Sequence, residues 1–286
     1  MSGKGSVLLY YEDGKTADYE LHSIAYELEP NGVAIATFSD EKTLNALTLN
    51  FLAEIFVIIE HAKRDPAVKV LIWTGRGKAW CSGAALKGEQ KVYVPADAIK
   101  EYKARAMMPG DKDIACKNLT LAFWDFPKPS IAAVQGLCVG GGTNMALCNF
   151  HDLVYCSEEA RFKLPFAQLG ITPEMSSSKT LPFLIGFAKA KALLMLGSWL
   201  PAREAERFGL VTAVVEAGQL MPEALGAARR LAAERHQEAL HLSKSLVNSH
   251  HRRELAGVLD EENRVIWEAI EKLKENGDLF RNFAKL

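Results

Sequence analysis

Two apolar runs of strand length, each followed by a glycine-rich segment, most constrain what this chain can fold into. VKVLIWTG, residues 68–75, continues into GRGKAWCSGAALKG, and SIAAVQG, residues 130–136, continues into LCVGGGTNMAL. An unbroken apolar run of this length indicates a strand buried on both faces, as in a parallel sheet. Glycine between such a strand and a helix lets backbone N–H groups point at an anion. The pair predicts a binding site at one edge of a sheet, whereas for either loop alone a tight turn is the favoured explanation.

Helical and strand-like segments alternate around these runs. HSIAYELEPNGVAIATFS contains two apolar runs joined by Pro-Asn-Gly, which predicts a hairpin. Thr48 is placed to cap a helix running to Asp65, and a further helix is expected at about 111–125. DLVYCS, from Asp152, predicts a third buried strand. The alternation predicts an α/β fold.

We expect three regions along the chain. Residues 1–20 show no apolar period and are predicted to be a flexible N-terminal arm. Residues 21–200 are predicted to form the α/β core, and residues 201–286 a helical region broken by the short strand LVTAVV. The last helix is expected to begin at Glu254 and to end just before Gly277.

Charge and residue content exclude several classes of protein. The 34 basic and 35 acidic side chains give a net charge of -1, whereas proteins that bind nucleic acid or a membrane surface usually carry a basic excess. No apolar run approaches the roughly 18 residues of a membrane span. The five cysteines form no CxxC pair and the seven histidines no HExxH, so no metal site is indicated. The glycine loops also lack the spacing of phosphate-loop and dinucleotide-binding motifs.

Four motifs in sequence order resemble the crotonase, or enoyl-CoA hydratase/isomerase, superfamily. They are TLNAL, DPAVKVLIWTGRGKAWCSGAAL, KPSIAAVQGLCVGGGTNMAL and LPAREAERFGLVTAVV. The resemblance implies a spiral of ββα units that binds an acyl-CoA thioester. It also implies a C-terminal helical region that joins subunits into a homotrimer or a dimer of trimers. No separate cofactor is implied, because coenzyme A enters as part of the substrate.

Members of this family polarise the thioester carbonyl with two backbone N–H groups, and the resemblance assigns these donors to Ala84 and Gly141. Such preorganised donors stabilise the charge that develops on an enolate oxygen. The resemblance further implies that residues of both loops and one nearby helix contact the substrate. This set is Ser82, Gly83, Ala84, Ala85, Leu86, Lys87, Gly141, Asn144 and Phe166.

The chain departs from the hydratase pattern of that family at its acidic residues. Asn144 and Phe166 stand where hydratases carry two glutamates, and Ala85 stands where an acid usually follows the first loop. Hydration needs a base for the water and an acid for carbon, which the two carboxylates would supply. Glu174, in LPFAQLGITPEMSSS, instead resembles the single catalytic glutamate of peroxisomal-type Δ3,Δ2-enoyl-CoA isomerases. One carboxylate suffices for that reaction, because it takes a proton from C2 and returns it to C4.

We therefore predict an isomerase of fatty-acid oxidation with Glu174, Ala84 and Gly141 as catalytic groups. Two alternatives stay open: a hydratase or acyl-CoA hydrolase in which Glu174 activates water, and an idle acyl-CoA-binding protein. Glu174 could also serve only to stabilise a helix N-terminus. The terminal Ala284-Lys285-Leu286 is a variant of the peroxisomal address SKL, so we expect a peroxisomal protein in a eukaryote and a cytoplasmic one in a bacterium.

Overall fold

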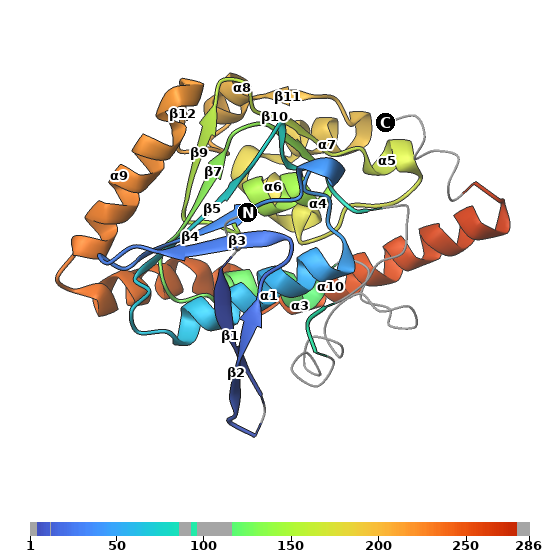
Figure 1. The fold of residues 1–286 in the computed structure, drawn as a ribbon. Coiled ribbons are helices and arrows are strands. Elements are labelled where there is room, and N and C mark those ends of the chain that lie inside the picture. Colours follow the sequence, from blue (N-terminus) through green and yellow to red (C-terminus); the bar gives the residue numbers. More distant parts are fainter. Residues whose placement is uncertain (1–4, 12, 86–92, 96–115, 279–286) are drawn as a thin grey trace.

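Two sheets with interleaved chain order form the core of the protein (Figure 1). The computed structural model describes residues 5–11, 13–85, 93–95 and 116–278. Within these ranges the large sheet has the order β12-β9-β7-β5-β4-β3, the small sheet has the order β11-β10-β8-β6, and β1 pairs with β2. The strands are β1 (Ser6–Tyr10), β2 (Thr16–Glu20), β3 (Ile24–Leu28), β4 (Val33–Phe38), β5 (Val70–Gly75), β6 (Ala79–Cys81), β7 (Ser130–Val134), β8 (Leu137–Val139), β9 (Leu153–Ser157), β10 (Arg161–Lys163), β11 (Leu200–Pro201) and β12 (Ala213–Val215).

A repeating unit explains this interleaving. β5 is followed by β6, β7 by β8 and β9 by β10, so that the chain passes three times from the large sheet to the small one. The three strands in each sheet are parallel. Within the described ranges, the helices that follow these three strand pairs are α3 (Lys117–Trp124), α4 (Gly141–Leu147) and α5 (Phe166–Leu169). The predicted ββα spiral is thus confirmed, and the α/β class with it.

The alternating side chains of β5 show why its sequence is apolar throughout. Leu71 and Trp73 join the main core on one face of the large sheet, where α1 (Leu49–Arg64) packs. Val70 and Ile72 join a second core on the other face, beneath α9 (Leu220–Ala233). Successive strand side chains point to opposite faces, so a strand covered on both sides must be apolar at every position. Figure 1 shows α9 lying along its face of the sheet.

The remaining helices follow the core strands. α1 begins after Thr48, as predicted, because the Thr48 hydroxyl accepts a hydrogen bond from the N–H of Phe51 at 3.1 Å. The other elements are the 3-10 helices η1 (Glu41–Thr43) and η2 (Ala217–Gln219) and the α-helices α6 (Ser177–Ile185), α7 (Phe187–Leu196), α8 (Ala202–Arg207) and α10 (Gln237–Glu275). None of the helices in the described ranges is both long enough and apolar enough to cross a membrane.

The prediction of a flexible arm is wrong for residues 6–20. This segment forms the β1–β2 hairpin, and its Val7, Leu9 and Tyr19 side chains are buried in the main core. The buried carboxylate of Glu54 on α1 anchors the end of the hairpin by accepting hydrogen bonds from the Tyr19 hydroxyl and the His22 N–H. A two-stranded hairpin is stabilised chiefly by what it packs against, so five-residue strands carry little signal of their own.

The C-terminal region also differs from its prediction. α10 begins at Gln237 rather than Glu254 and runs for 39 residues. Its first turns carry apolar side chains such as Leu242, Leu246 and Val247 that remain exposed, so they form no stripe directed at the core. The predicted strand LVTAVV is confirmed as β12, which extends the large sheet, and α9 covers one face of that sheet.

Gly142 allows one ββα unit to pack on the unit before it. A Cβ atom on Gly142 would stand 2.3 Å from the carbonyl oxygen of Cys81, and backbone cannot move aside as a side chain can. We therefore expect Gly142→Ala to lower the free energy of unfolding by about 1–3 kcal/mol, the usual range for overpacking. Denaturant-induced unfolding measures the change.

Gly226→Ala is the matched control, because Gly226 lies within α9 and no atom stands within 4 Å of the added Cβ. This variant should gain roughly 0.5–1 kcal/mol from its higher helix propensity. The packing argument fails if Gly142→Ala unfolds at the same denaturant concentration as the parent.

Candidate active site

In the first glycine loop, the N–H of Ala84 points away from Leu47, the residue with which Ala84 forms a β-bridge. Leu47 donates a hydrogen bond to the Gly83 carbonyl at 2.8 Å and accepts one from the N–H of Ala85 at 3.1 Å. This is a parallel bridge between Leu47 and Ala84, in which Leu47 uses both of its groups and the groups of Ala84 face the other side. Ala84 is exposed, and its N–H has no acceptor within the described part of the chain. It is available to a ligand.

The second glycine loop ends at the start of α4. Gly140 has φ 53°, a left-handed conformation that favours glycine, and its N–H bonds the Lys163 carbonyl at 2.9 Å. Gly141 is the first residue of α4, where backbone N–H groups have no partner within the helix. No residue that the structure describes accepts a hydrogen bond from the Gly141 N–H.

The two loops are in direct backbone contact. A Cβ atom on Gly83 would stand 2.6 Å from the carbonyl oxygen of Val139, just as one on Gly142 would meet Cys81. The side chain of Leu47 also reaches Gly141, where an added Cβ would be 2.9 Å from its Cδ1 atom. The donors that the resemblance assigned, Ala84 and Gly141, therefore lie on adjoining segments with an apolar side chain beside them. The loops follow β6 and β8 of the small sheet, three-residue strands too short to show a period in the sequence.

The structure brings Glu174 to this pair of loops. Its Oε1 atom lies 3.4 Å from the position that a Cβ on Gly141 would occupy, and the Sδ atom of Met175 lies 3.3 Å from the same point. Glu174 belongs to the segment between α5 and α6, so it comes from a different unit of the spiral than either loop. The candidate base and a candidate oxyanion donor are therefore neighbours in space although 33 positions apart in sequence.

The Glu174 carboxyl has an unusual ionisation. Burial and, to a smaller extent, the nearby Glu262 carboxylate together raise its pKa from 4.5 to about 8. The side chain is half-buried, and no described residue donates a hydrogen bond to its oxygens. This carboxyl group is partly accessible, receives no hydrogen bond from a described residue, and has a pKa near neutrality. Such a group is suited to accepting a proton from a substrate.

Two of the predicted substrate contacts have other roles in this structure. Asn144 is fully buried, and its amide donates a hydrogen bond to the Glu174 carbonyl at 3.0 Å and accepts one from Cys148. It holds the segment that carries Glu174 instead of facing an opening. Phe166, only 1% exposed, is part of the main core. Asn144 lies in the first turn of α4, and Phe166 is the first residue of α5.

The other predicted residues divide in two groups. Ser82 and Ala85 are partly exposed at the first loop, where the Ser82 hydroxyl donates to the Thr43 carbonyl at 3.2 Å. Leu86, Lys87 and the terminal Ala284-Lys285-Leu286 lie outside the described residues. Leu47 and Glu262 were not singled out from the sequence. Leu47 lies within the TLNAL motif, which is a usable signal, whereas Glu262 is one charged residue among many on a polar helix.

Neither a metal nor a reactive thiol is indicated at the site. Within the described ranges no three His, Cys, Asp or Glu side chains are grouped as metal ligands. Cys81 borders the first loop but is fully buried, and burial raises the pKa of its thiol to about 12. The thiolate is the nucleophilic form of cysteine, so this thiol is unreactive at neutral pH. Glu174 is the titratable side chain that the structure places beside the Gly141 loop.

Comparison with known proteins identifies the family. A profile described as enoyl-CoA hydratase/isomerase matches residues 29–281, which is most of the chain. This protein belongs to the enoyl-CoA hydratase/isomerase family. The resemblance seen in the four motifs is thereby confirmed, and the chain is an enzyme of this family.

Relatives within the enoyl-CoA hydratase/isomerase family carry both kinds of name. A probable enoyl-CoA hydratase of Rhizobium meliloti is 34% identical over 200 residues, covering 70% of this chain and 72% of the relative. Enoyl-CoA delta isomerase 2 of Rattus norvegicus is 31% identical over 260 residues, covering 91% of this chain but only 61% of that longer protein. The crystal structure of an enoyl-CoA hydratase/isomerase from Pseudoalteromonas atlantica superposes with a TM-score of 0.78 at 27% identity, covering 92% of this chain and 98% of that one.

The raised pKa of Glu174 predicts a pH-dependent effect on stability. Its pKa is about 4.5 in the unfolded chain and about 8 in the fold, so the folded protein holds this proton more tightly. The resulting stabilisation is complete below about pH 4.5 and is lost as the pH rises through about 8. Glu174→Gln cannot ionise and should not show the loss.

Thermal unfolding of parent and variant between about pH 5 and pH 9 measures this difference. We expect Glu174→Gln to become progressively more stable than the parent up to about pH 8 and to keep that advantage above it. The exposed Glu159 provides the control, since Glu159→Gln should give no such trend. A stability difference that stays constant across the range would show that the Glu174 pKa is ordinary.

Proposed function

We propose that this enzyme is an isomerase that shifts a double bond of an enoyl-CoA from the 3 to the 2 position. The observation that carries the proposal is the single partly exposed carboxylate of Glu174 beside the Gly141 loop. The positions where the hydratase pattern carries glutamates hold Asn144 and Phe166, and both side chains are buried. A reaction that needs one base rather than an acid–base pair fits this arrangement.

In the proposed reaction a single carboxylate removes a proton from the substrate and returns the same proton to it. The carboxylate of Glu174 removes a proton from C2 of a 3-enoyl-CoA, and the electrons of that C–H bond delocalise into a dienolate. The N–H groups of Ala84 and Gly141 donate hydrogen bonds to the thioester oxygen, where the negative charge gathers. The protonated Glu174 then returns the proton to C4, the double bond moves to C2–C3, and the carboxylate is regenerated. No cofactor takes part, because coenzyme A is a portion of the substrate.

The pKa of Glu174 supports this role. A C2 proton beside a thioester is weakly acidic, and a base with a pKa of about 8 accepts it more readily than an ordinary carboxylate would. The same carboxyl, once protonated, remains strong enough as an acid to protonate C4. Because only the ionised form starts the reaction, turnover should rise with pH up to the pKa of Glu174.

A hydratase of the same fold is the second candidate. It is favoured by the hydratase name of the Rhizobium relative, and Glu174 retains the solvent contact that activation of a water would need. An idle acyl-CoA-binding protein would show neither reaction. Assays of 3-enoyl-CoA isomerisation and 2-enoyl-CoA hydration on the same preparation distinguish the three.

Glu174→Gln tests the assigned base. The amide keeps the size of the side chain but cannot accept the C2 proton, so isomerisation should fall by about 10²–10⁴-fold while acyl-CoA binding persists. Exchange of the C2 proton with deuterated water, followed by mass spectrometry, should be lost in parallel. The control variant Glu159→Gln should match the parent in both assays. Isomerisation by a folded Glu174→Gln protein at the parental rate would exclude Glu174 as the base.

We further propose that the chain assembles as a homotrimer or a dimer of trimers. Large apolar side chains are exposed on the three helices α6, α7 and α10, at positions where water contact is unfavourable. They are Phe183, Phe187, Met195, Leu196, Leu242, Leu246 and Val247, each between 63% and 75% exposed. A set of this kind is expected where another protein surface covers it.

Light scattering of the purified chain at micromolar concentration should give a mass of three or six subunits. Leu246→Glu and Phe187→Glu place a charge among these exposed apolar side chains and should shift the mass toward the monomer. Glu238→Lys, a charge change on an exposed part of the same α10, is expected to leave the assembly intact. A parent protein that remains monomeric would refute the assembly.

A further inference from the structure

One carboxylate of the C-terminal helix reaches into the backbone of the segment that carries Glu174. Glu262 on α10 is only 5% exposed. It accepts hydrogen bonds from the N–H of Ser176 at 2.8 Å, the N–H of Ser178 at 3.0 Å and the hydroxyl of Ser178 at 2.5 Å. Hydrogen bonds to an ionised acceptor are stronger than those between neutral groups, so this is a firm attachment.

The Glu262 hydrogen bonds lie beside two residues in a strained backbone conformation. Met175 and Ser176, directly after Glu174, have φ values of 53° and 67°, a left-handed conformation that side-chain-bearing residues rarely adopt. Such a conformation persists only when surrounding contacts enforce it. Glu262 enforces it on the far side of these two residues, and the amide of Asn144 holds the Glu174 carbonyl on the near side. Side chains from two different helices, α4 and α10, thus hold the backbone on either side of Glu174.

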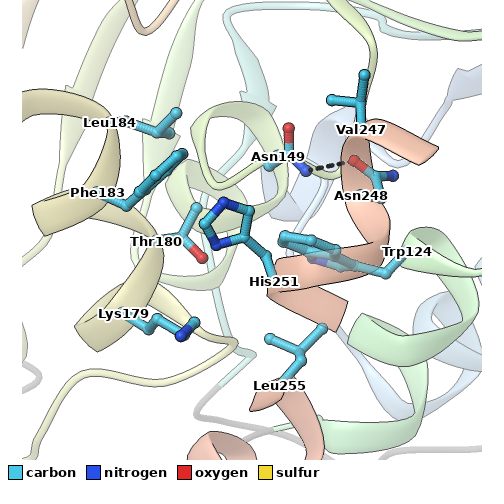
Figure 2. A pocket seen from close by; sticks show the side chains of 10 residues that line it. All are labelled: Trp124, Asn149, Lys179, Thr180, Phe183, Leu184, Val247, Asn248, His251 and Leu255. Carbon is cyan, nitrogen blue, oxygen red and sulfur yellow. Dashed lines mark hydrogen bonds between the residues drawn. The ribbon is translucent and has the colours of Figure 1, made fainter. Parts of the chain in front are cut away.

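Apolar packing between α6 and α10 does little to replace these hydrogen bonds. A cavity of about 140 Å³ lies in that contact. Figure 2 shows Thr180 and Phe183 of α6 on one side of it and Leu255 of α10 on the other. The attachment close to Glu174 is polar: it consists of the Glu262 hydrogen bonds and an ion pair between Lys179 and Glu254. A change at Glu262 should therefore loosen the Glu174 segment without collapsing a core.

Glu262 also places negative charge next to Glu174. It acts in the same direction as burial on the pKa of the Glu174 carboxyl. Burial raises the pKa of Glu262 itself, and its hydrogen bonds from Ser178 and Ser176 oppose that rise and favour the ionised form. Other titratable groups near the two carboxyls in the described part of the chain are Cys148, directly after α4, the exposed Glu261 of α10, and the Lys179–Glu254 pair.

We propose that Glu262 is the positioning residue for the catalytic base, holding the 174–178 segment so that the Glu174 carboxylate faces the Gly141 loop. The inference rests on the proposed function, because it assigns Glu262 a role through Glu174. Glu262 does not touch the substrate in this scheme. Its role is to fix the direction and the electrostatic surroundings of the group that does.

Glu262→Gln and Glu262→Asp separate these two contributions. Glu262→Gln removes the charge and replaces one acceptor with a donor, so kcat should fall by about 10- to 100-fold with KM little changed. The acidic limb of its pH–rate profile should also move to lower pH, because the neighbouring negative charge is gone. Glu262→Asp keeps the charge but shortens the reach, so its kcat should fall while the acidic limb stays at the parental pH.

Glu261→Gln is the matched control, since Glu261 is the neighbouring residue and its exposed carboxylate pairs with Arg264 on the same helix. It should be parental in kcat, KM and pH profile. Ser178→Ala is a milder variant that removes a single donor and should lower kcat less than Glu262→Gln does. It keeps the test open if Glu262→Gln folds poorly.

Parental kcat and an unmoved acidic limb in folded Glu262→Gln, or parental kcat in both Glu262→Asp and Ser178→Ala, would overturn the inference. A parent protein without isomerase activity would instead refute the proposed function. In that case the pH-dependent stability difference between the parent and Glu174→Gln still tests the electrostatic part, because Glu262→Gln should shrink it. An undiminished difference in the Glu262→Gln background would refute that part as well.

Discussion

The close approach of two backbone segments is the constraint on which the rest of this structure depends. The loop after β6 and the loop after β8 touch at Gly83 and Gly142, where a single added carbon would stand within 2.6 Å of a carbonyl oxygen of the other segment. Only glycine permits this distance. Because the loops touch, consecutive units of the spiral stack tightly, and the N–H groups of Ala84 and Gly141 come to lie on adjoining segments.

The site combines this closely packed pair of loops with a third segment, which carries Glu174 and is attached to two other helices. The Glu174 segment is backbone-strained at Met175 and Ser176, and it is held by side chains from α4 and α10. Strain of this kind is often found where a functional group must be held in one direction. The long helix α10 therefore reaches this segment through Glu262. It also carries exposed apolar side chains, for which we propose a role in assembly.

Membership of the enoyl-CoA hydratase/isomerase family explains the fold and the acyl-CoA chemistry, but it leaves the reaction to a few side chains. In this chain the position after the triple glycine is an asparagine whose amide is consumed in holding the Glu174 carbonyl. A glutamate there would present a carboxylate to the same region. The replacement converts a position that holds a catalytic acid in the hydratase pattern into a structural support for a different carboxylate, which is why we favour a one-base reaction.

The sequence by itself determined the parts of this protein that depend on local pattern. Continuous apolar runs identified β5, β7 and β9, Thr48 marked the start of α1, and the two glycine loops with Glu174 marked the candidate site. Each of these rests on residue type and short-range spacing, which a chain carries with it whatever its partners. The β1–β2 hairpin and the short strands β6 and β8 escaped notice because elements of three to five residues are stabilised by packing rather than by their own periodicity.

Only the tertiary structure decided how the site residues act. The direction of the Ala84 N–H follows from its bridge to Leu47, and the inward turn of Asn144 follows from the Glu174 carbonyl 30 positions away. Glu262 contributes to the raised pKa of Glu174 and accepts a hydrogen bond from the N–H of Ser176, although it lies more than 80 positions from either residue. Over such separations, the packing of the units in space decides which groups are buried, close in charge or hydrogen-bonded. A single charged residue on a polar helix does not show in the sequence which backbone groups it will contact.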